Sequence, residues 1–261
     1  TLPVAPDSIV PAAAITGRRR SDTRLATVML ANHETGAIQP VAELARDGIP
    51  FHTDGAQAVG KMRVNFHQLG VTSLSLSGHK FGGPVGIGAL LVSRCAKLKP
   101  LLFGGHQQHG RRPGTEPVAL AVGMAAALSA SLCHLETTNR QMLAFRTRFL
   151  DRLLADAAPV ALNGPATGGL PYVLNLSFPG CRADALLAAL DLAGVACSTG
   201  SACSSGSLLP SPVLQAMGVS GDRLHSAMRF SFGPGLTADQ IDEAARIVVH
   251  VVQRLRAIHE E

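Results

Sequence analysis

HTDGAQAVGKMRVNFHQLGVTSLSLSGHK, residues 52–80, contains two segments that each have the pattern of a strand and end in polar residues. The first ends at Asp54, where a turn of small residues follows. The second, residues 73–77, alternates serine with leucine at the two-residue period of a strand and stops at Gly78, two residues before Lys80. We therefore expect both strands to deliver polar side chains to the carboxyl edge of an open α/β sheet, where ligands gather.

An acid and a lysine in this order suit the cofactor pyridoxal phosphate (PLP). An enzyme that uses PLP needs a lysine amine to bind its aldehyde carbon and a carboxylate to hold its pyridine nitrogen protonated, so that the ring can accept electrons. Asp54 and Lys80 supply these two groups, although either residue alone is more typical of a solvated surface than of a cofactor site. The glycine-rich residues 82–88 lack the spacing of a dinucleotide fingerprint and indicate close backbone approach around Lys80.

This stretch resembles the cysteine desulfurases of the class V aminotransferase superfamily, in which a strand ending His-x-Asp-x-x-Gln precedes a strand ending Ser-x-His-Lys. HTDGAQ and SGHK match both motifs. The resemblance implies that Lys80 carries PLP and that Asp54 pairs with the ring nitrogen. It also implies that Gln57 meets the ring hydroxyl, that Ser77 and His79 bind the phosphate, and that His79 and Lys80 are catalytic.

Residues 25–36, LATVMLANHETG, predict a buried strand that ends in polar residues. Desulfurases usually have Asn-Asn-Glu-Thr-Gly here, with the second Asn near the ring hydroxyl, and His33 stands at that position. The resemblance therefore implies that Asn32 and His33 bind the cofactor. A turn that caps the following helix is an equally good interpretation of Asn32.

LLFGGHQQHGRRPGTE, residues 101–116, resembles a family loop that crosses a dimer interface. In that loop a threonine reaches the phosphate of the PLP in the second copy. The resemblance implies this role for Thr115, and with it a homodimer. Without the family, an arginine-rich glycine loop is more typical of a solvated surface.

A cysteine lies in VACSTGSACSSGSLLPSPVL, residues 195–214. Cys203 is surrounded by Ser, Gly and Thr, which cannot pack a core, so we expect a mobile loop with a solvated, reactive thiol. STGSACSS also resembles the catalytic loop of the desulfurases, which implies that Cys203 is the nucleophile. We expect the other cysteines to be buried as small apolar residues; they are Cys95, Cys133, Cys181 and Cys197.

Two further strand-like segments carry the expected substrate contacts. HSAMRFSFG, residues 225–233, resembles the family strand whose arginine binds the substrate α-carboxylate, which implies this role for Arg229. Asn175 in YVLNLSF, residues 172–178, matches an asparagine common in the family and is predicted to bind substrate. A buried, satisfied amide is the alternative for Asn175.

The resemblance extends from residue 1 to about residue 256 and implies an α/β protein of PLP-dependent transferase fold type I. We expect a mainly parallel sheet in an incomplete large domain, residues 1–135, and a smaller α+β C-terminal domain, residues 136–261. The Ala-rich residues 117–157 predict one long helix between them. Family members have a further segment of roughly a hundred residues before this point. We therefore expect a fragment or truncated product with weak PLP binding and activity.

The composition excludes several other classes. The chain has 261 residues, 46% of them hydrophobic, and no uncharged apolar run of about eighteen residues, so we expect neither a membrane span nor membrane binding. No signal peptide is visible. A net charge of +5 with dispersed basic residues, one Tyr and no Trp argues against nucleic acid. Five cysteines without paired spacing predict no metal site and favour a reducing cytoplasm.

The resemblance implies PLP-dependent removal of sulfur from L-cysteine, giving L-alanine and a persulfide on Cys203. The sulfur would pass to an acceptor protein such as an iron–sulfur scaffold, or to thiolation. Two alternatives remain. One is another class V PLP aminotransferase or lyase, such as a selenocysteine lyase, in which Cys203 is incidental. The other is an inactive truncated homologue that acts as a binding or dimerisation module.

Overall fold

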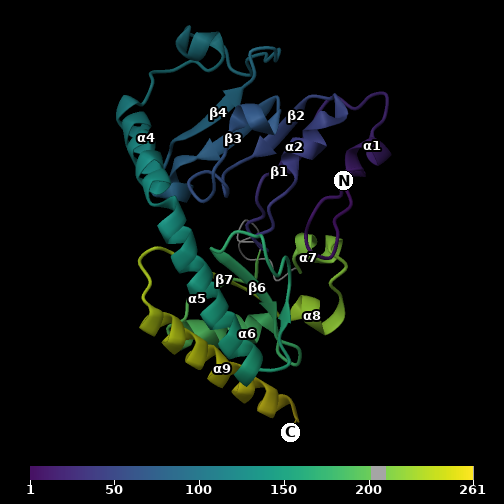
Figure 1. Cartoon of the computed structure of the whole chain (residues 1–261), viewed down its shortest axis with the longest axis vertical. Coiled ribbons are helices and arrows are strands. Elements are labelled where there is room, and N and C mark those ends of the chain that lie inside the picture. The colour runs from purple at the N-terminus through teal and green to yellow at the C-terminus, as the bar shows by residue number, and fades with distance from the viewer. Residues whose placement is uncertain (201–209, 261) are drawn as a thin grey trace. The chain divides into compact units, whose positions relative to one another are not determined.

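The computed structural model describes residues 1–200 and 210–260, without the side chains of residues 259 and 260 (Figure 1). Its contacts form two compact units. The large-sheet unit comprises Ile15–Leu30 and Pro40–Leu135, and the small-sheet unit comprises Thr1–Ala14, Ala31–Gln39 and Glu136–Glu261. The division into domains at residue 135 stays a prediction.

The strands are β1 (Ala26–Met29), β2 (Phe51–Asp54), β3 (Ser73–Ser77), β4 (Gly88–Val92), β5 (Ala161–Leu162), β6 (Val173–Ser177) and β7 (Ala227–Ser231). The α-helices are α1 (Ala14–Arg18), α2 (Val41–Leu44), α3 (Phe66–Leu69), α4 (Val118–Cys133), α5 (Leu135–Asp156), α6 (Ala183–Leu192), α7 (Pro212–Ala216), α8 (Gly221–His225) and α9 (Ala238–Glu260). The 3-10 helices are η1 (Ala45–Asp47), η2 (Gly78–Phe81) and η3 (Gln107–Gly110).

The sheet of the large-sheet unit has the order β1-β2-β3-β4 (Figure 1). β1, β2 and β3 run parallel, and β4 pairs antiparallel with β3. Val28, Phe51 and Leu74 are buried members of its core. This mainly parallel arrangement confirms the predicted fold class, and it brings the carboxyl ends of β2 and β3 to one edge.

In the connection between β2 and β3, a polar residue caps the start of helix α3 and a glycine ends it. Asn65 caps α3 by accepting hydrogen bonds from the backbone N–H groups of His67 and Gln68, at 3.0 and 3.2 Å. Gly70 ends the helix with φ +66°, a conformation that favours glycine. The chain then returns as β3, parallel to β2.

The glycine-rich turn after β3 holds backbone against backbone, as the sequence indicates. Gly83 N donates to Gly78 O at 2.9 Å, and a Cβ on Gly83 would lie 2.9 Å from that oxygen. A Cβ on Gly88 would lie 2.5 Å from Leu76 O. Larger residues would therefore push the turn that carries Lys80 away from the end of β3.

The small-sheet unit contains an antiparallel sheet of order β5-β6-β7. All of β6 is buried. One face of the sheet is apolar: Phe230 of β7 contacts Phe149 of α5, with ring centroids 5.0 Å apart. The opposite face carries polar side chains, Asn175 and Arg229 among them, because successive residues of a strand point to opposite faces.

Two helices of the small-sheet unit follow the sequence pattern closely. α6 ends before Gly194, which has φ +86°. Ahead of α9, Thr237 N donates to Gln240 Oε1 at 2.9 Å and Gln240 N donates to Thr237 Oγ1 at 3.3 Å. This reciprocal pair is the capping box that the sequence predicts.

Two expectations are wrong. The expected single helix over residues 117–157 is two helices, α4 and α5, because the backbone at His134 leaves the helical region at φ −103° and ψ 7°. Cys95 and Cys133 are exposed rather than buried; Cys133 lies on α4, which buries none of its residues. Among the described residues, no single helix is long and apolar enough to cross a membrane, and only the broken pair α4 and α5 passes that test together.

Candidate functional site

The predicted cofactor residues of the large-sheet unit lie at the carboxyl edge of its sheet. Asp54 ends β2, and Ser77 ends β3. Since Asp54 pairs in register with Ser75, strand alternation places the side chains of Asp54, Ser75 and Ser77 on the same face. Lys80 follows in η2 and is exposed, as Asp54 is. The sheet thus brings an acid and two hydroxyls to one edge and face, with the lysine in the next turn.

The two predicted phosphate ligands are in contact. Ser77 Oγ and His79 Nδ1 lie 2.9 Å apart, and the direction of their hydrogen bond depends on the histidine tautomer. His79 is exposed at the turn that follows β3. Both groups can therefore serve one anion at this strand end.

A second lysine, Lys61, lies near Lys80, and the sequence pattern did not single it out. Lys61 Nζ donates to Gln57 Oε1 at 2.6 Å. Burial, and then the charge of Lys80, lower the pKa of Lys61 from 10.5 to about 8. Because its oxygen is occupied, Gln57 keeps its Nε2 donor for an acceptor such as a ring hydroxyl oxygen. The spacing of four residues between Gln57 and Lys61 is too common to have signalled this contact.

Thr115 is exposed in the loop that precedes α4. Nearby, Gln108 Nε2 donates to Glu116 Oε1 at 2.6 Å and ties the two ends of the loop. The expected contact between Thr115 and a second copy stays a prediction.

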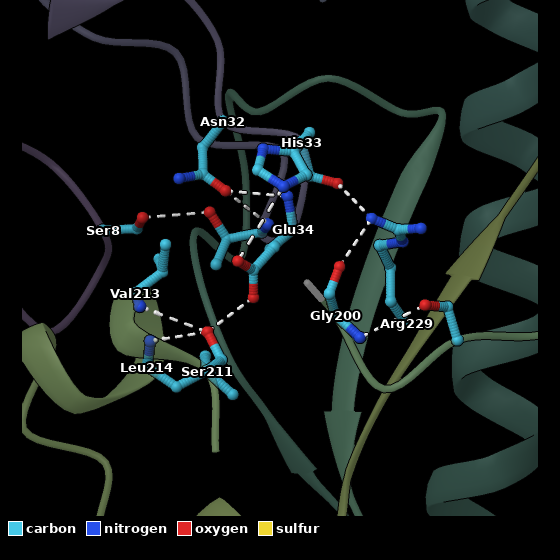
Figure 2. Close-up of polar contacts among 11 residues, drawn as sticks. Ser8, Asn32, His33, Glu34, Gly200, Ser211, Val213, Leu214 and Arg229 are labelled. Atoms are coloured by element: carbon cyan, nitrogen blue, oxygen red, sulfur yellow. Dashed lines mark hydrogen bonds and ion pairs between the residues drawn. The ribbon is translucent and has the colours of Figure 1, made fainter. Parts of the chain in front are cut away.

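Three further predicted residues, Asn32, His33 and Arg229, belong to the small-sheet unit (Figure 2). Asn32 Oδ1 accepts hydrogen bonds from the backbone N–H groups of Glu34 and Thr35, at 2.8 and 3.0 Å. These bonds confirm a turn at Asn32, but Asn32 does not cap the following helix, because the N-cap of α2 is Pro40 and has no side-chain hydrogen bond. The cofactor role of Asn32 stays a prediction. The side chain of His33 is 34% exposed, with Nε2 3.9 Å from Glu34 Oε1.

Glu34 is a buried carboxylate that the sequence did not assign. It is only 1% exposed and accepts a hydrogen bond from Ser211 Oγ at 2.6 Å (Figure 2). Ser211 Oγ in turn accepts from the N–H groups of Val213 and Leu214, at 3.2 Å each, and caps α7. Glu34 therefore fixes the chain close after residues 201–209. Cys203 belongs to that segment, outside the described residues.

Arg229 lies on β7 and holds the chain before the same segment. Its Nη1 donates to Gly200 O at 2.9 Å and to His33 O at 3.4 Å (Figure 2). Its backbone pairs with Ser198. Its Nε is buried and has no hydrogen-bond partner among residues 1–200 and 210–260. Within those ranges the guanidinium meets backbone oxygens and no carboxylate, so its charge has room for an anion.

Asn175 lies directly opposite Arg229 in the β6–β7 register. Its Oδ1 accepts a hydrogen bond from Asn163 Nδ2 at 2.9 Å. Its Nδ2 is buried and, within the part of the chain that the structure describes, unpaired. The expectation of a satisfied amide is therefore wrong for this nitrogen. Asn175 Nδ2 and Arg229 Nε form a donor pair on one sheet face, and unpaired buried donors indicate a ligand that accepts hydrogen bonds.

The chain is similar to a known protein family and to several known proteins. The family model for class-V aminotransferases matches residues 2–244. A cysteine desulfurase from Trichormus azollae is 42% identical over 241 residues, which cover 91% of this chain and 60% of that protein. The chain spans 60 to 64% of the length of the first curated relatives that it matches.

Solved structures show the same fold. A NifS-like protein superposes with a TM-score of 0.87 at 28% identity, covering 97% of this chain and 67% of its own. A structure of SspA in complex with cysteine has a TM-score of 0.73 at 30% identity, covering 89% of this chain and 65% of its own.

Proposed function

Because the chain belongs to the class-V aminotransferase family, we propose that it acts as a PLP-dependent cysteine desulfurase. The substrate is L-cysteine and the products are L-alanine and a persulfide on Cys203. The observation that carries the assignment to an amino acid is the donor pair. Arg229 Nε and Asn175 Nδ2 are buried, unpaired within the described residues and on one sheet face, which suits a free α-carboxylate.

The residues of the large-sheet unit fit PLP. Lys80 offers the amine, Asp54 the carboxylate, and Ser77 with His79 a contacting pair for the phosphate. Gln57 fits the ring hydroxyl, since Lys61 orients its amide through Oε1 and its Nε2 group can donate a hydrogen bond. When bound, PLP supplies an electron sink at the substrate α-carbon.

Residues of the chain carry out the other steps of the reaction. Asp54 keeps a proton on the pyridine nitrogen, and Arg229 with Asn175 orients the substrate by its carboxylate. The Cys203 thiolate attacks the sulfur of L-cysteine, so that an S–S bond forms and the Cβ–S bond breaks. The electron pair of the broken bond stays with the substrate carbon skeleton, where Cβ takes up a proton to give alanine.

Partners and location belong to the same proposal. The similar SspA structure contains cysteine, which supports L-cysteine as the substrate. We assign Thr115 to a homodimer contact at the phosphate of the second copy. An acceptor protein such as an iron–sulfur scaffold takes the sulfur from Cys203. A persulfide needs a reduced thiol, so the reaction belongs in the cytoplasm.

Two variants test this function. Lys80→Ala is expected to abolish the visible absorbance band of lysine-bound PLP, whereas Lys97→Ala, at an exposed lysine after β4, is expected to keep it. Cys203→Ser is expected to keep the band and to release no sulfide from L-cysteine. An unchanged band in Lys80→Ala would exclude Lys80 as the PLP lysine. Sulfide release by Cys203→Ser would favour another class V activity, and no band in the unsubstituted protein would favour a binding module.

A further inference from the structure

Asn175 of the donor pair belongs to a group of buried polar side chains, and the proposed chemistry uses no other member of that group. Asn163, Asn175 and Ser177 are 1%, 1% and 0% exposed. Buried amides and hydroxyls are costly unless their hydrogen bonds are made, so their connections define their orientation. All three belong to the small-sheet unit, on or beside β5 and β6.

Asn163 is the centre of this group. Its Nδ2 donates to Asn175 Oδ1 at 2.9 Å and to Ser177 Oγ at 2.7 Å. Its backbone N–H donates to Asn175 O at 2.9 Å. Arg223 Nη2 donates to Asn163 Oδ1 at 2.9 Å. Both ends of the Asn163 amide are therefore occupied.

Arg223 determines which way the amide groups of Asn163 and Asn175 face. A guanidinium can only donate, so the oxygen of the Asn163 amide must face Arg223 and its nitrogen must face β6. Two hydrogens on that nitrogen require an acceptor at Asn175, which is Oδ1. The Nδ2 of Asn175 is consequently turned away from Asn163. Its Cβ stands about 4.5–5.5 Å from the Cβ of Arg229, because the two residues are directly opposite on paired strands.

We propose that Asn163, held by Arg223, is a positioning residue that fixes Asn175 with its NH₂ group outward, and that this makes the donor pair selective for a free carboxylate. The inference rests on the proposed function. Within residues 1–200 and 210–260 the two donors have no acceptor, so they favour a group that only accepts hydrogen bonds. A carboxamide has N–H donors of its own, which would face the two donors of the site with no acceptor between them. Burying donors without acceptors costs free energy, so the carboxamide should bind more weakly.

Asn163→Asp separates this role from simple packing. The new carboxylate keeps an oxygen for Arg223 and nearly the same shape, but it cannot donate to Asn175. Asn175 is then expected to turn over, donating to the new carboxylate and presenting Oδ1 beside Arg229. The preference for L-alanine over L-alaninamide, measured as the ratio of their dissociation constants in the PLP-loaded protein by calorimetry, is expected to fall roughly ten- to hundredfold.

The matched control is Asn139→Asp, the same chemical change in the same unit. Asn139 Oδ1 accepts a hydrogen bond from the Tyr172 hydroxyl at 2.8 Å, and a carboxylate can accept it too. This control should keep the preference of the unsubstituted protein. An unchanged preference in Asn163→Asp would overturn the inference while the proposed function stands. An unsubstituted protein that binds neither compound would overturn both.

A second measurement needs no variant and so does not depend on folding of Asn163→Asp. L-alanine added to the unsubstituted protein is expected to shift the proton resonances of Asn175 Nδ2 and Arg229 Nε together, while those of Asn163 Nδ2 stay in place. A shift at Arg229 Nε without one at Asn175 Nδ2 would overturn the inference.

Discussion

In the large-sheet unit the predicted cofactor residues Asp54, His79 and Lys80 are exposed, whereas in the small-sheet unit Glu34 and Asn163 are 1% exposed. The exposed residues lie at the end of a strand or in the turn that follows one, where a parallel sheet leaves its edge open. The buried residues are joined to neighbours through hydrogen bonds of 2.6 to 2.9 Å. The exposed residues can therefore be hydrated by water, whereas the buried residues depend on hydrogen bonds within the protein.

The difference is energetic. An exposed acid or lysine loses little hydration on folding and contributes little to stability. A buried carboxylate or amide must keep every contact, since a lost partner leaves an unsatisfied group in an apolar setting. Substitutions at the first set should therefore change ligand binding, and substitutions at the second set should change folding as well.

The largest expected effect on stability comes from Glu34→Ala. The change leaves the Ser211 hydroxyl without its carboxylate acceptor and opens a cavity beneath α7. We expect the free energy of unfolding of the small-sheet unit to fall by roughly 2 to 4 kcal/mol. Hydrogen exchange of amides in β6 and β7, measured without PLP, reports on that unit.

Asp54→Ala is the matched acid-to-alanine control in the large-sheet unit. Asp54 is exposed, and its Oδ1 accepts a hydrogen bond from Ala56 N at 2.8 Å. Without PLP, the stability of the large-sheet unit is expected to change by no more than about 1 kcal/mol. Equal losses in the two variants would contradict the comparison.

The sequence predicted one of these sets much better than the other. Asp54, Ser77 and Lys80 stand at or just after the ends of two strands that the sequence pattern predicted, and the structure confirms these strands. The cofactor roles of the three residues stay predictions. The mainly parallel sheet and the class-V aminotransferase family were also predicted from the sequence and are confirmed.

The supporting residues could not be predicted, because their roles arise from contacts between distant segments. Glu34 and Ser211 are separated by 177 positions, and Arg223 and Asn163 by 60. The break at His134 had no proline or glycine signal in an Ala-rich helical pattern. Nothing local distinguishes such residues from ordinary turn or helix residues.

A smaller effect on stability is expected from Lys61, which is partly buried and feels the charge of the exposed Lys80. Folding lowers its pKa from 10.5 to about 8, chiefly through burial and secondly through Lys80. Because burial is the larger cause, Lys80→Met should raise the pKa of Lys61 by less than half of the whole shift, or less than about 1.3 units. Titration of the labelled Lys61 amine by NMR measures this value.

The lowered pKa of Lys61 determines how the stability of the large-sheet unit changes with pH. Between pH 8 and 10.5 the folded protein has released the Lys61 proton and the unfolded chain still holds it. The unfolded state therefore binds more protons, and the stability of the large-sheet unit rises with pH across this window. Lys61→Met should remove that rise. A rise that persists in Lys61→Met, or a return of the pKa to 10.5 in Lys80→Met, would show that Lys61 is not a buried lysine.

The smallest effect is expected at the ion pair between Arg148 of α5 and Asp242 of α9, whose side chains are 55% and 47% exposed. Both nitrogens of the guanidinium fork contact the carboxylate, and this contact lowers the pKa of Asp242. The pair belongs to the small-sheet unit, as Glu34 does, but water and salt screen it. Arg148→Ala should therefore leave the amide exchange of β6 and β7 unchanged within error, at low and at high salt. A loss as large as that of Glu34→Ala would mean that the position in this unit, and not burial, decides what a polar contact contributes.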